Sequence, residues 1–189
     1  MGGTTMIEGK LVNLRAPEMS DLERNARWVN DREVTRFLAF RYQMSLAAEE
    51  AWLRDLASKP TSYERAFFAI ETKDGAHIGN TNLFDVKPED RKAKLGIMIG
   101  EKNCWSKGYG SDALTTLLRF AFGEMNLNRV ELDVFAFNER AIASYRKCGF
   151  VEEGRRRQAL YKGGRYHDVL VMGALRDEWA GDQEPGTGD

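Results

Sequence analysis

The chain has 189 residues, enough for one domain or at most two very small ones. Apolar residues make up 42% and charged residues 30%, which is the balance of an ordinary soluble globular protein. Lysine and arginine total 28 and aspartate and glutamate 29, so the formal net charge is −1. This balance argues against a dedicated nucleic-acid-binding protein, which usually carries a strong basic excess.

Features of secreted, membrane or metal-binding proteins are not expected. Two cysteines, Cys104 and Cys148, are too few for a disulfide scaffold and fit free thiols in a reducing cytoplasm. The N-terminus shows no basic region followed by an apolar stretch, and no apolar run approaches the ~18 residues of a membrane span. With only two histidines, His77 and His167, no metal site is predicted. The expected location is therefore cytoplasmic.

The N-terminal third is expected to hold one strand and two helices. The strand is predicted at Lys10–Arg15, and the pattern S-D-L-E is typical of a capping box that opens a helix over Ser20–Trp28. Asn30–Tyr42 is expected to be irregular. Ser45 can cap a second helix, Leu46–Ser58. Its apolar face is predicted to carry Ala48, Trp52 and Leu56.

Strand patterns dominate the middle of the chain. Ala66–Glu71 and Ala76–Val86 flank the turn Lys73–Gly75 and predict a hairpin. Lys94–Gly100 is a short, continuously apolar run, as expected of a strand buried on both faces.

The next elements follow a glycine-bearing loop, Glu101–Gly110. A helix is predicted at Ser111–Glu124, and Val130–Val134 alternates with acidic residues like a half-buried strand. A further helix, Asn138–Lys147, is expected to end at a C′ glycine, Gly149. The apolar stripe of the longer helix comprises Ala113, Leu114, Leu117, Leu118, Ala121 and Met125.

The last predicted unit is a hairpin of Phe150–Tyr161 and Arg165–Leu175 around Lys162–Gly164. The expected order is β-α-α-β-β-β-α-β-α-β-β, a mixed α/β domain with one sheet. Residues 1–9 are expected to be a flexible N-terminus, 10–180 the domain, and 181–189 a disordered acidic tail.

The loop Trp105–Ser111 is the most informative segment for chemistry. A glycine-rich turn that enters a helix directs several backbone N–H groups at one point, where the helix dipole favours an anion. Gly108 and Gly110 would let the backbone approach a pyrophosphate, and Lys107 could add charge. The same spacing also fits an ordinary helix start. No Walker A motif is present, and the dinucleotide fingerprint fails because residue 113 is alanine.

A second constellation lies in Asn138–Phe150. Asn138 closes a strand and opens a helix, and Tyr145 lies two turns later on roughly the same helix face. The tyrosine hydroxyl could reach the same crevice, although a tyrosine on a short helix also fits a simple packing role.

Together these segments resemble the GCN5-related N-acetyltransferase (GNAT) superfamily, and within it the RimJ/RimL-like branch of ribosomal-protein and polyamine N-acetyltransferases. The resemblance covers about Lys10–Trp179 and is strongest in Ile97–Ala113 and Asn138–Phe150. Trp28–Leu38 and Gly164–Met172 also look like this branch. The resemblance implies a single-domain GNAT fold: a mixed, mostly antiparallel sheet with splayed central strands, flanked by about four helices.

The resemblance further implies acetyl-CoA as cosubstrate, bound in a V-shaped opening between Leu95–Ile99 and Arg129–Phe137. Strand backbone would pair with the pantetheine arm, and the loop N–H groups would hold the pyrophosphate. Asn138 would hydrogen-bond the pantetheine, and Tyr145 would sit beside the thioester sulfur. Members of this branch are often dimers, so a homodimer is one alternative, and the oligomeric state stays open. The cofactor-binding residues assigned in this way are Ile97, Met98, Ile99, Lys107, Gly108, Tyr109, Gly110, Ser111, Asn138 and Arg140.

Direct acetyl transfer needs a neutral amine, a polarised thioester carbonyl and a proton for the departing thiolate. A backbone N–H near Met98 or Ile99 can act as the oxyanion donor, and Tyr145 can donate the proton. The general base stays open, since each candidate also fits a solvated surface carboxylate. The candidates are Asp31, Asp85 and Glu101.

The leading hypothesis is an acetyl-CoA-dependent N-acetyltransferase that acts on a primary amine of a peptide N-terminus or small molecule. The alternatives are a non-catalytic CoA-binding or regulatory module and a small-molecule-binding domain without CoA. The resemblance implies that Arg27–Tyr42 forms the wall of the acceptor site. Polyamines are expected to be poor acceptors, because the excess of arginine in this segment would repel a polycation. These arginines are Arg27, Arg32, Arg36 and Arg41.

Overall fold

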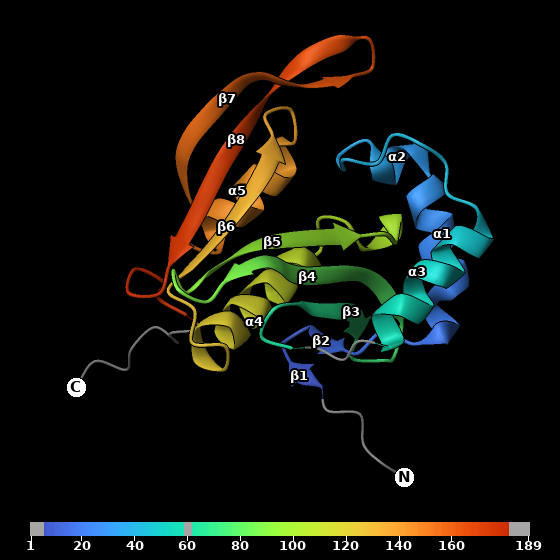
Figure 1. Ribbon diagram of the computed structural model, residues 1–189, viewed down its shortest axis with the longest axis horizontal. Coiled ribbons are helices and arrows are strands. Elements are labelled where there is room, and N and C mark those ends of the chain that lie inside the picture. The colour runs from blue at the N-terminus through green and yellow to red at the C-terminus, as the bar shows by residue number, and fades with distance from the viewer. Residues whose placement is uncertain (1–5, 59–61, 182–189) are drawn as a thin grey trace.

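Eight hydrogen-bonded strands form one sheet in the computed structural model, which describes residues 6–58 and 62–181. Within these residues the strand order is β1-β2-β3-β4-β5-β6-β8-β7 (Figure 1). Only β5 and β6 run parallel, so the mixed, mostly antiparallel sheet is confirmed. The strands are β1 Ile7–Glu8, β2 Val12–Arg15, β3 Ala66–Thr72, β4 His77–Lys87, β5 Lys92–Ile99, β6 Arg129–Phe135, β7 Val151–Lys162 and β8 Arg165–Leu175.

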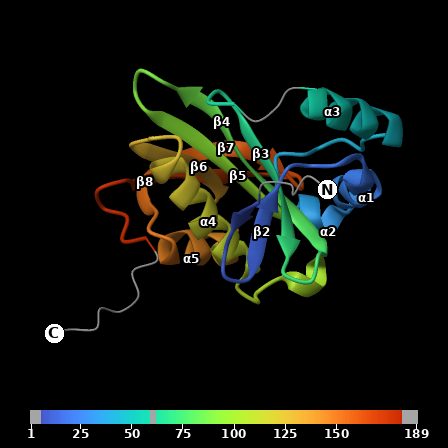
Figure 2. The same cartoon turned by 90° about the horizontal axis from the view of Figure 1, so that it is seen from below.

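The helices lie on both faces of this sheet. In Figure 1 α1, α2 and α3 gather at one end of the sheet, and Figure 2 shows α3 and α4 on opposite sides of it. Helix α4 packs against β2, β5 and β6. The helices are α1 Leu22–Asn30, α2 Arg32–Thr35, α3 Leu46–Ser58, α4 Tyr109–Gly123 and α5 Glu139–Lys147, with 3-10 turns at Met19–Asp21 and Lys102–Cys104.

The core forms where the sequence pattern placed it. The predicted stripe of α4 is buried, and so are the alternating residues Val130, Leu132 and Val134 of β6. Both glycine turns of the predicted hairpins are confirmed, with Gly75 and Gly164 at φ +87° and +80°. These conformations favour glycine because a Cβ would clash with the backbone.

Three predictions near the N-terminus differ from the structure. The predicted strand Lys10–Arg15 begins only at Val12, as β2, and an additional strand, β1, forms at Ile7–Glu8 within the segment assigned to the N-terminus and pairs with β2. The expected capping box is wrong: the Glu18 N–H donates to the Asp21 carboxylate at 2.8 Å, and α1 begins at Leu22. Asn30–Tyr42 is not wholly irregular, since Asp31 caps the one-turn helix α2. The expectations for residues 1–5 and 182–189 lie outside the described residues.

The buried face of α3 also differs from the prediction. Ala48 is exposed and Trp52 retains 38% of its surface, whereas Glu49, Leu53 and Leu56 are buried. Glu49, Leu53 and Leu56 occur at helical spacing and share one side of the helix. The prediction assigns every glutamate of this helix to solvent. Because Glu49 is in fact buried, the predicted buried face is displaced around the helix axis from the observed one.

Strands β5 and β6 separate after a short parallel contact. They pair only where Lys92–Lys94 meets Arg129–Glu131, and beyond Lys94 they diverge, as Figure 1 shows. The predicted splay of the central strands is therefore confirmed. Ile97–Ile99 is half-buried rather than buried on both faces, because both sides of this strand end line cavities.

Candidate active site

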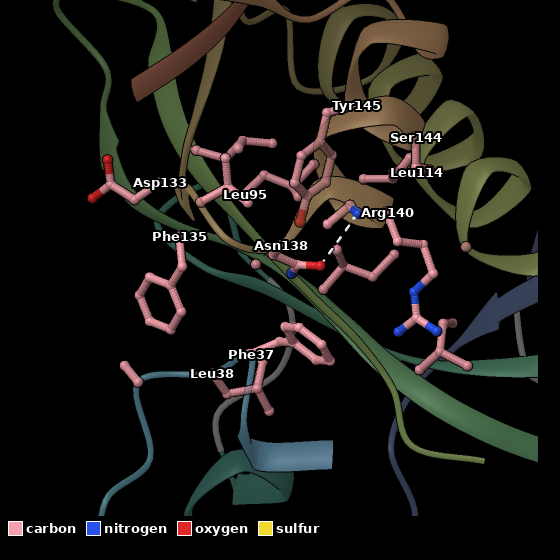
Figure 3. Close-up of a pocket in the computed structure, with 18 of the residues that line it drawn as sticks. Phe37, Leu38, Leu95, Leu114, Asp133, Phe135, Asn138, Arg140, Ser144 and Tyr145 are labelled. Atoms are coloured by element: carbon pink, nitrogen blue, oxygen red, sulfur yellow. Dashed lines mark hydrogen bonds between the residues drawn. The ribbon is translucent and has the colours of Figure 1, made fainter. Parts of the chain in front are cut away.

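A cavity of about 790 Å³ opens where β5 and β6 diverge. The loop before α4 and the helix α5 close it. Figure 3 shows side chains from β5, β6, α4 and α5 around this space. Of the predicted site residues, Met98, Lys107 and Tyr109 are not among those lining it. The predicted residues that do line it are Ile97, Ile99, Gly108, Gly110, Ser111, Asn138, Arg140 and Tyr145.

The N-terminus of α4 supplies unpaired backbone donors to this cavity. Gly108 precedes the helix at φ +89°, and the first intrahelical bond runs from the Asp112 N–H to the Gly108 carbonyl at 2.9 Å. The N–H groups of residues 109–111 therefore have no acceptor within the helix. A Cβ on Gly110 would lie 3.6 Å from Ile99 Cγ1, an ordinary contact. The helix begins two residues earlier than predicted, and its first turn suits an anion.

Asn138 is the N-cap of α5, as its position between strand and helix predicted. Its Oδ1 accepts the Ala141 N–H at 3.3 Å, the dashed line in Figure 3. That bond fixes the side chain, which is 8% exposed, and leaves the Nδ2 hydrogens as donors on the cavity side.

Tyr145 brings a hydroxyl to the same cavity. Its half-buried ring packs edge-on against Phe150 with centroids 5.8 Å apart, and Figure 3 shows the hydroxyl turned toward Asn138. No hydrogen bond to this hydroxyl comes from the described residues. Burial raises the pKa of Tyr145 to about 12, so the group is a protonated donor at neutral pH.

Trp105 ties the loop to the edge of β5. Its Nε1–H donates to the Ile99 carbonyl at 2.8 Å, and the Arg140 guanidinium lies 4.3 Å from its ring centroid. Arg140 also lies 5.7 Å from the ring of Phe37, so two aromatic rings hold the cation at the cavity wall. This positioning of Arg140 was not predicted, because it depends on residues far apart in sequence.

Backbone groups of β5 alternate between its two edges. Trp105 reaches the Ile99 carbonyl on the cleft edge, whereas the Thr81 hydroxyl donates to the Gly96 carbonyl at 2.9 Å on the β4 edge. Ile97 therefore presents its N–H and C=O to the cleft, and Ile99 presents its N–H. The backbone of Met98 faces β4, which departs from its predicted role, and its side chain lines a second cavity.

The three predicted base candidates are each engaged elsewhere. The Asp31 carboxylate caps α2 and contacts Lys102 at 3.0 Å, which lowers its pKa. Asp85 pairs with Lys87 at 3.0 Å, which also lowers its pKa. The carboxylate of Glu101 contacts Arg27 and accepts the Trp28 Nε1–H at 3.2 Å. None of the three lines the cavity among its described walls.

The second cavity, of about 500 Å³, lies on the other side of β5 between the sheet, α1 and α3. It contains Glu49 and Asn25, two buried polar residues that sequence reasoning missed. The sequence pattern that could have indicated their burial is a polar residue at helical spacing from buried apolar residues. The walls that both cavities share are Leu38, Ala39, Phe84, Gly96 and Ile97.

A family model for an acetyltransferase (GNAT) domain matches residues 12–151. The chain belongs to the GNAT acetyltransferase family. The predicted family and class of reaction, acetyl-CoA-dependent N-acetyl transfer to an amine, are thereby confirmed, and the fold agrees with solved members.

This GNAT chain is similar to three acetyltransferases over different shares of its length. It is 36% identical over 110 residues to "Putative ribosomal N-acetyltransferase YdaF" of Bacillus subtilis (strain 168), covering 58% of this chain and 60% of that protein, less than two thirds of its length. It is 26% identical over 171 residues to the uncharacterized N-acetyltransferase p20 of Bacillus licheniformis, covering 90% and 96%. The crystal structure of spermidine N-acetyltransferase from Vibrio cholerae in complex with CoA and spermine superposes with a TM-score of 0.80 at 27% identity, covering 89% and 97%.

Two further observations concern the described part of this GNAT domain. None of its helices within residues 6–58 and 62–181 is long and apolar enough to cross a membrane. Across the same residues, no three His, Cys, Asp or Glu side chains gather as a metal site would require.

Proposed function

We propose that this chain moves the acetyl group of acetyl-CoA to the primary amine of a peptide N-terminus or small molecule by direct transfer in a ternary complex. The observation that carries this proposal is the meeting of two cavities along β5. One has unpaired N–H donors for phosphates, the other is a separate pocket for the amine, and both include Gly96 and Ile97. Two reactants bound in these cavities would meet beside this strand, which removes much of the entropic cost of reaction.

In this proposal the first cavity binds CoA. The first-turn N–H groups of α4, including those of Tyr109, Gly110 and Ser111, hold the pyrophosphate, with Gly108 allowing the approach and Lys107 adjacent. The cleft edge of Ile97 and Ile99 pairs with the pantetheine arm. Asn138 Nδ2 donates to the same arm, and Arg140 closes the wall. What supports these roles is the row of donors without protein partners.

The proposed chemistry uses one hydrogen-bond donor and one proton donor of this chain. The Ile99 N–H, on the cleft edge, stabilises negative charge on the thioester oxygen. The Tyr145 hydroxyl protonates the departing thiolate, because its raised pKa keeps it protonated at neutral pH. The amine attacks the carbonyl carbon and loses its extra proton to solvent or a carboxylate.

We further propose a cytoplasmic location, which two free cysteines support, and a homodimer, which light scattering would test. For the reaction itself, calorimetry measures binding of CoA, and release of free thiol from acetyl-CoA reports turnover across an amine panel. Binding of CoA without acetylation of any amine would instead favour a non-catalytic CoA-binding module. A chain that binds no CoA would refute the assignment of the first cavity.

A further inference from the structure

Glu49 is a carboxylate placed in an apolar cavity without a counterion. It is 3% exposed and lies on the buried face of α3, where Leu53 and Leu56 follow at helical spacing. Among the described residues no side chain or backbone group hydrogen-bonds or ion-pairs with its carboxylate. Burial raises the pKa of Glu49, since water is removed and nothing replaces it. An unpaired buried carboxylate costs stability, and a ligand that carries an amine would offset this cost.

Asn25 lines the same cavity and carries an unpaired donor, whose identity follows from a chain of hydrogen bonds. His77 Nε2 lies 2.9 Å from the Gly79 carbonyl, which can only accept, so this nitrogen carries a hydrogen. It therefore donates also to Asn80 Oδ1 at 3.0 Å, and Asn80 Nδ2 donates to Asn25 Oδ1 at 2.9 Å. Asn25 is 1% exposed, and its Nδ2 has no partner among the described residues.

The rest of the cavity wall is largely apolar. Of the described residues that line it, Glu49 is the only one with a titratable side chain. The aromatic rings of Trp52 and Phe67 pack edge-on with centroids 5.2 Å apart. The site thus offers the carboxyl group of Glu49, the amides of Asn25 and Asn82, and an apolar surface. A ligand that satisfies all three carries a cationic or neutral amine, an oxygen that accepts a hydrogen bond, and an apolar group.

The geometry points to an α-amino amide as the acceptor: a primary amine held by Glu49, the neighbouring carbonyl oxygen bound by Asn25 Nδ2, and an apolar side group against Trp52 and Phe67. In a protein this chemistry occurs at a peptide N-terminus whose first residue is apolar. The inference rests on the proposed function, because it assigns the substrate class of the acceptor pocket.

Charge separates this class from two other kinds of amine. A free amino acid carries a carboxylate, and no basic side chain lines the described cavity to pair with it. A polyamine carries further ammonium groups, and the described residues that line the cavity include no carboxylate besides Glu49 to pair with them. The predicted arginine wall does not supply this selectivity, since of the four arginines only Arg41 lines either described cavity.

The first test compares Glu49→Gln with Glu50→Gln, a control on the same helix whose carboxylate pairs with Arg54 at the surface. Leucinamide is the probe, and thiol release is the readout. Loss of a hydrogen bond to a charged group corresponds to an about 10- to 100-fold rise in KM for leucinamide. CoA affinity should stay unchanged in both variants. Equal KM values for wild type and both variants would overturn the role of Glu49.

A measurement without catalysis accompanies this test. Because the folded-state pKa of Glu49 is raised, its ionised form destabilises the free protein above that pKa. Glu49→Gln should raise Tm at pH 7, and the gain should shrink as the pH falls and the wild-type carboxyl is protonated. An unchanged Tm at both pH values would show that Glu49 finds a partner in the free protein, contrary to the inference.

The second test separates the amine from the carbonyl by varying the ligand. Leucinamide and 3-methylbutylamine share the side group, but only leucinamide carries the carbonyl. Wild type should show the lower KM for leucinamide, and Asn25→Leu should remove that difference. The ratio of the two KM values, measured on one preparation, does not depend on the fraction folded. A ratio that Asn25→Leu leaves intact would overturn the role of Asn25.

Further acceptors show whether the natural substrate is a protein N-terminus or a small molecule, and which class of amine reacts. A peptide amide that begins with leucine should react at least as well as leucinamide if the natural acceptor is a protein, whereas a lower rate for the peptide would assign the site to small α-amino amides. Free leucine and spermidine should be poor acceptors. Efficient turnover of spermidine with inert amides would overturn the inference and leave the proposed transfer intact. CoA binding without turnover of any amine would instead overturn the proposed function.

Discussion

Replacing Tyr145 by phenylalanine removes one hydroxyl and keeps the ring that packs against Phe150 at 5.8 Å. Because no described residue hydrogen-bonds that hydroxyl, the change leaves no protein partner unsatisfied, and we expect an unchanged Tm and near-normal CoA affinity. If the hydroxyl protonates the thiolate, its loss should lower kcat about 10²-fold or more. A hundredfold corresponds to about 2.7 kcal/mol of transition-state stabilisation.

The assay is thiol release in a single turnover, where chemistry limits the observed rate. Tyr166→Phe is the matched control, since Tyr166 is 62% exposed on β8 and does not line the cavity. With a pKa of about 12, Tyr145 should keep its proton throughout the neutral range, so its ionisation should not limit kcat below pH 10. A Phe variant within twofold of the parent would assign the proton to water and leave Tyr145 a packing role.

Two further predictions concern the cofactor and the fold. Gly110→Val should abolish measurable CoA binding in calorimetry, because the new side chain fills the phosphate approach while its Cβ meets Ile99 only at 3.6 Å; Gly123→Val, with nothing within 4 Å on the same helix, should bind normally. Burial raises the pKa of Asp21, but hydrogen bonds from Arg15 and His77 outweigh it and hold the pKa well below its usual range. Asp21→Ala should therefore cost about 3–5 kcal/mol, or roughly 6–20 °C in Tm. The difference from wild type should begin to shrink as the pH falls below about 4, where Asp21 takes up a proton in the unfolded chain, and it should vanish only below the depressed pKa of the folded state. An equal Tm at pH 7 would refute the stabilising role of Asp21.

Much of the architecture follows from local sequence. The stripe of α4 repeats at helical spacing, and residues of β6 alternate, so both elements appear where the pattern predicts them. Gly149 ends α5 at φ +93°, a conformation that glycine adopts without steric cost. The glycine loop and the Asn138 cap were also predictable, because each depends on a few consecutive residues.

Other features were decided only by tertiary structure. The edge of β5 that faces the cleft depends on which strand pairs on its other side, so the departure of Met98 from its predicted role could not be foreseen. The same holds for Asn25 and Glu49, which helical patterning assigns to solvent. Their burial reflects a cavity formed by α1, α3 and the sheet together. Hydrophobic periodicity reports the average environment of a helix face, whereas a buried polar residue is defined by partners distant in sequence, and that is why the acceptor pocket emerged only from the folded chain.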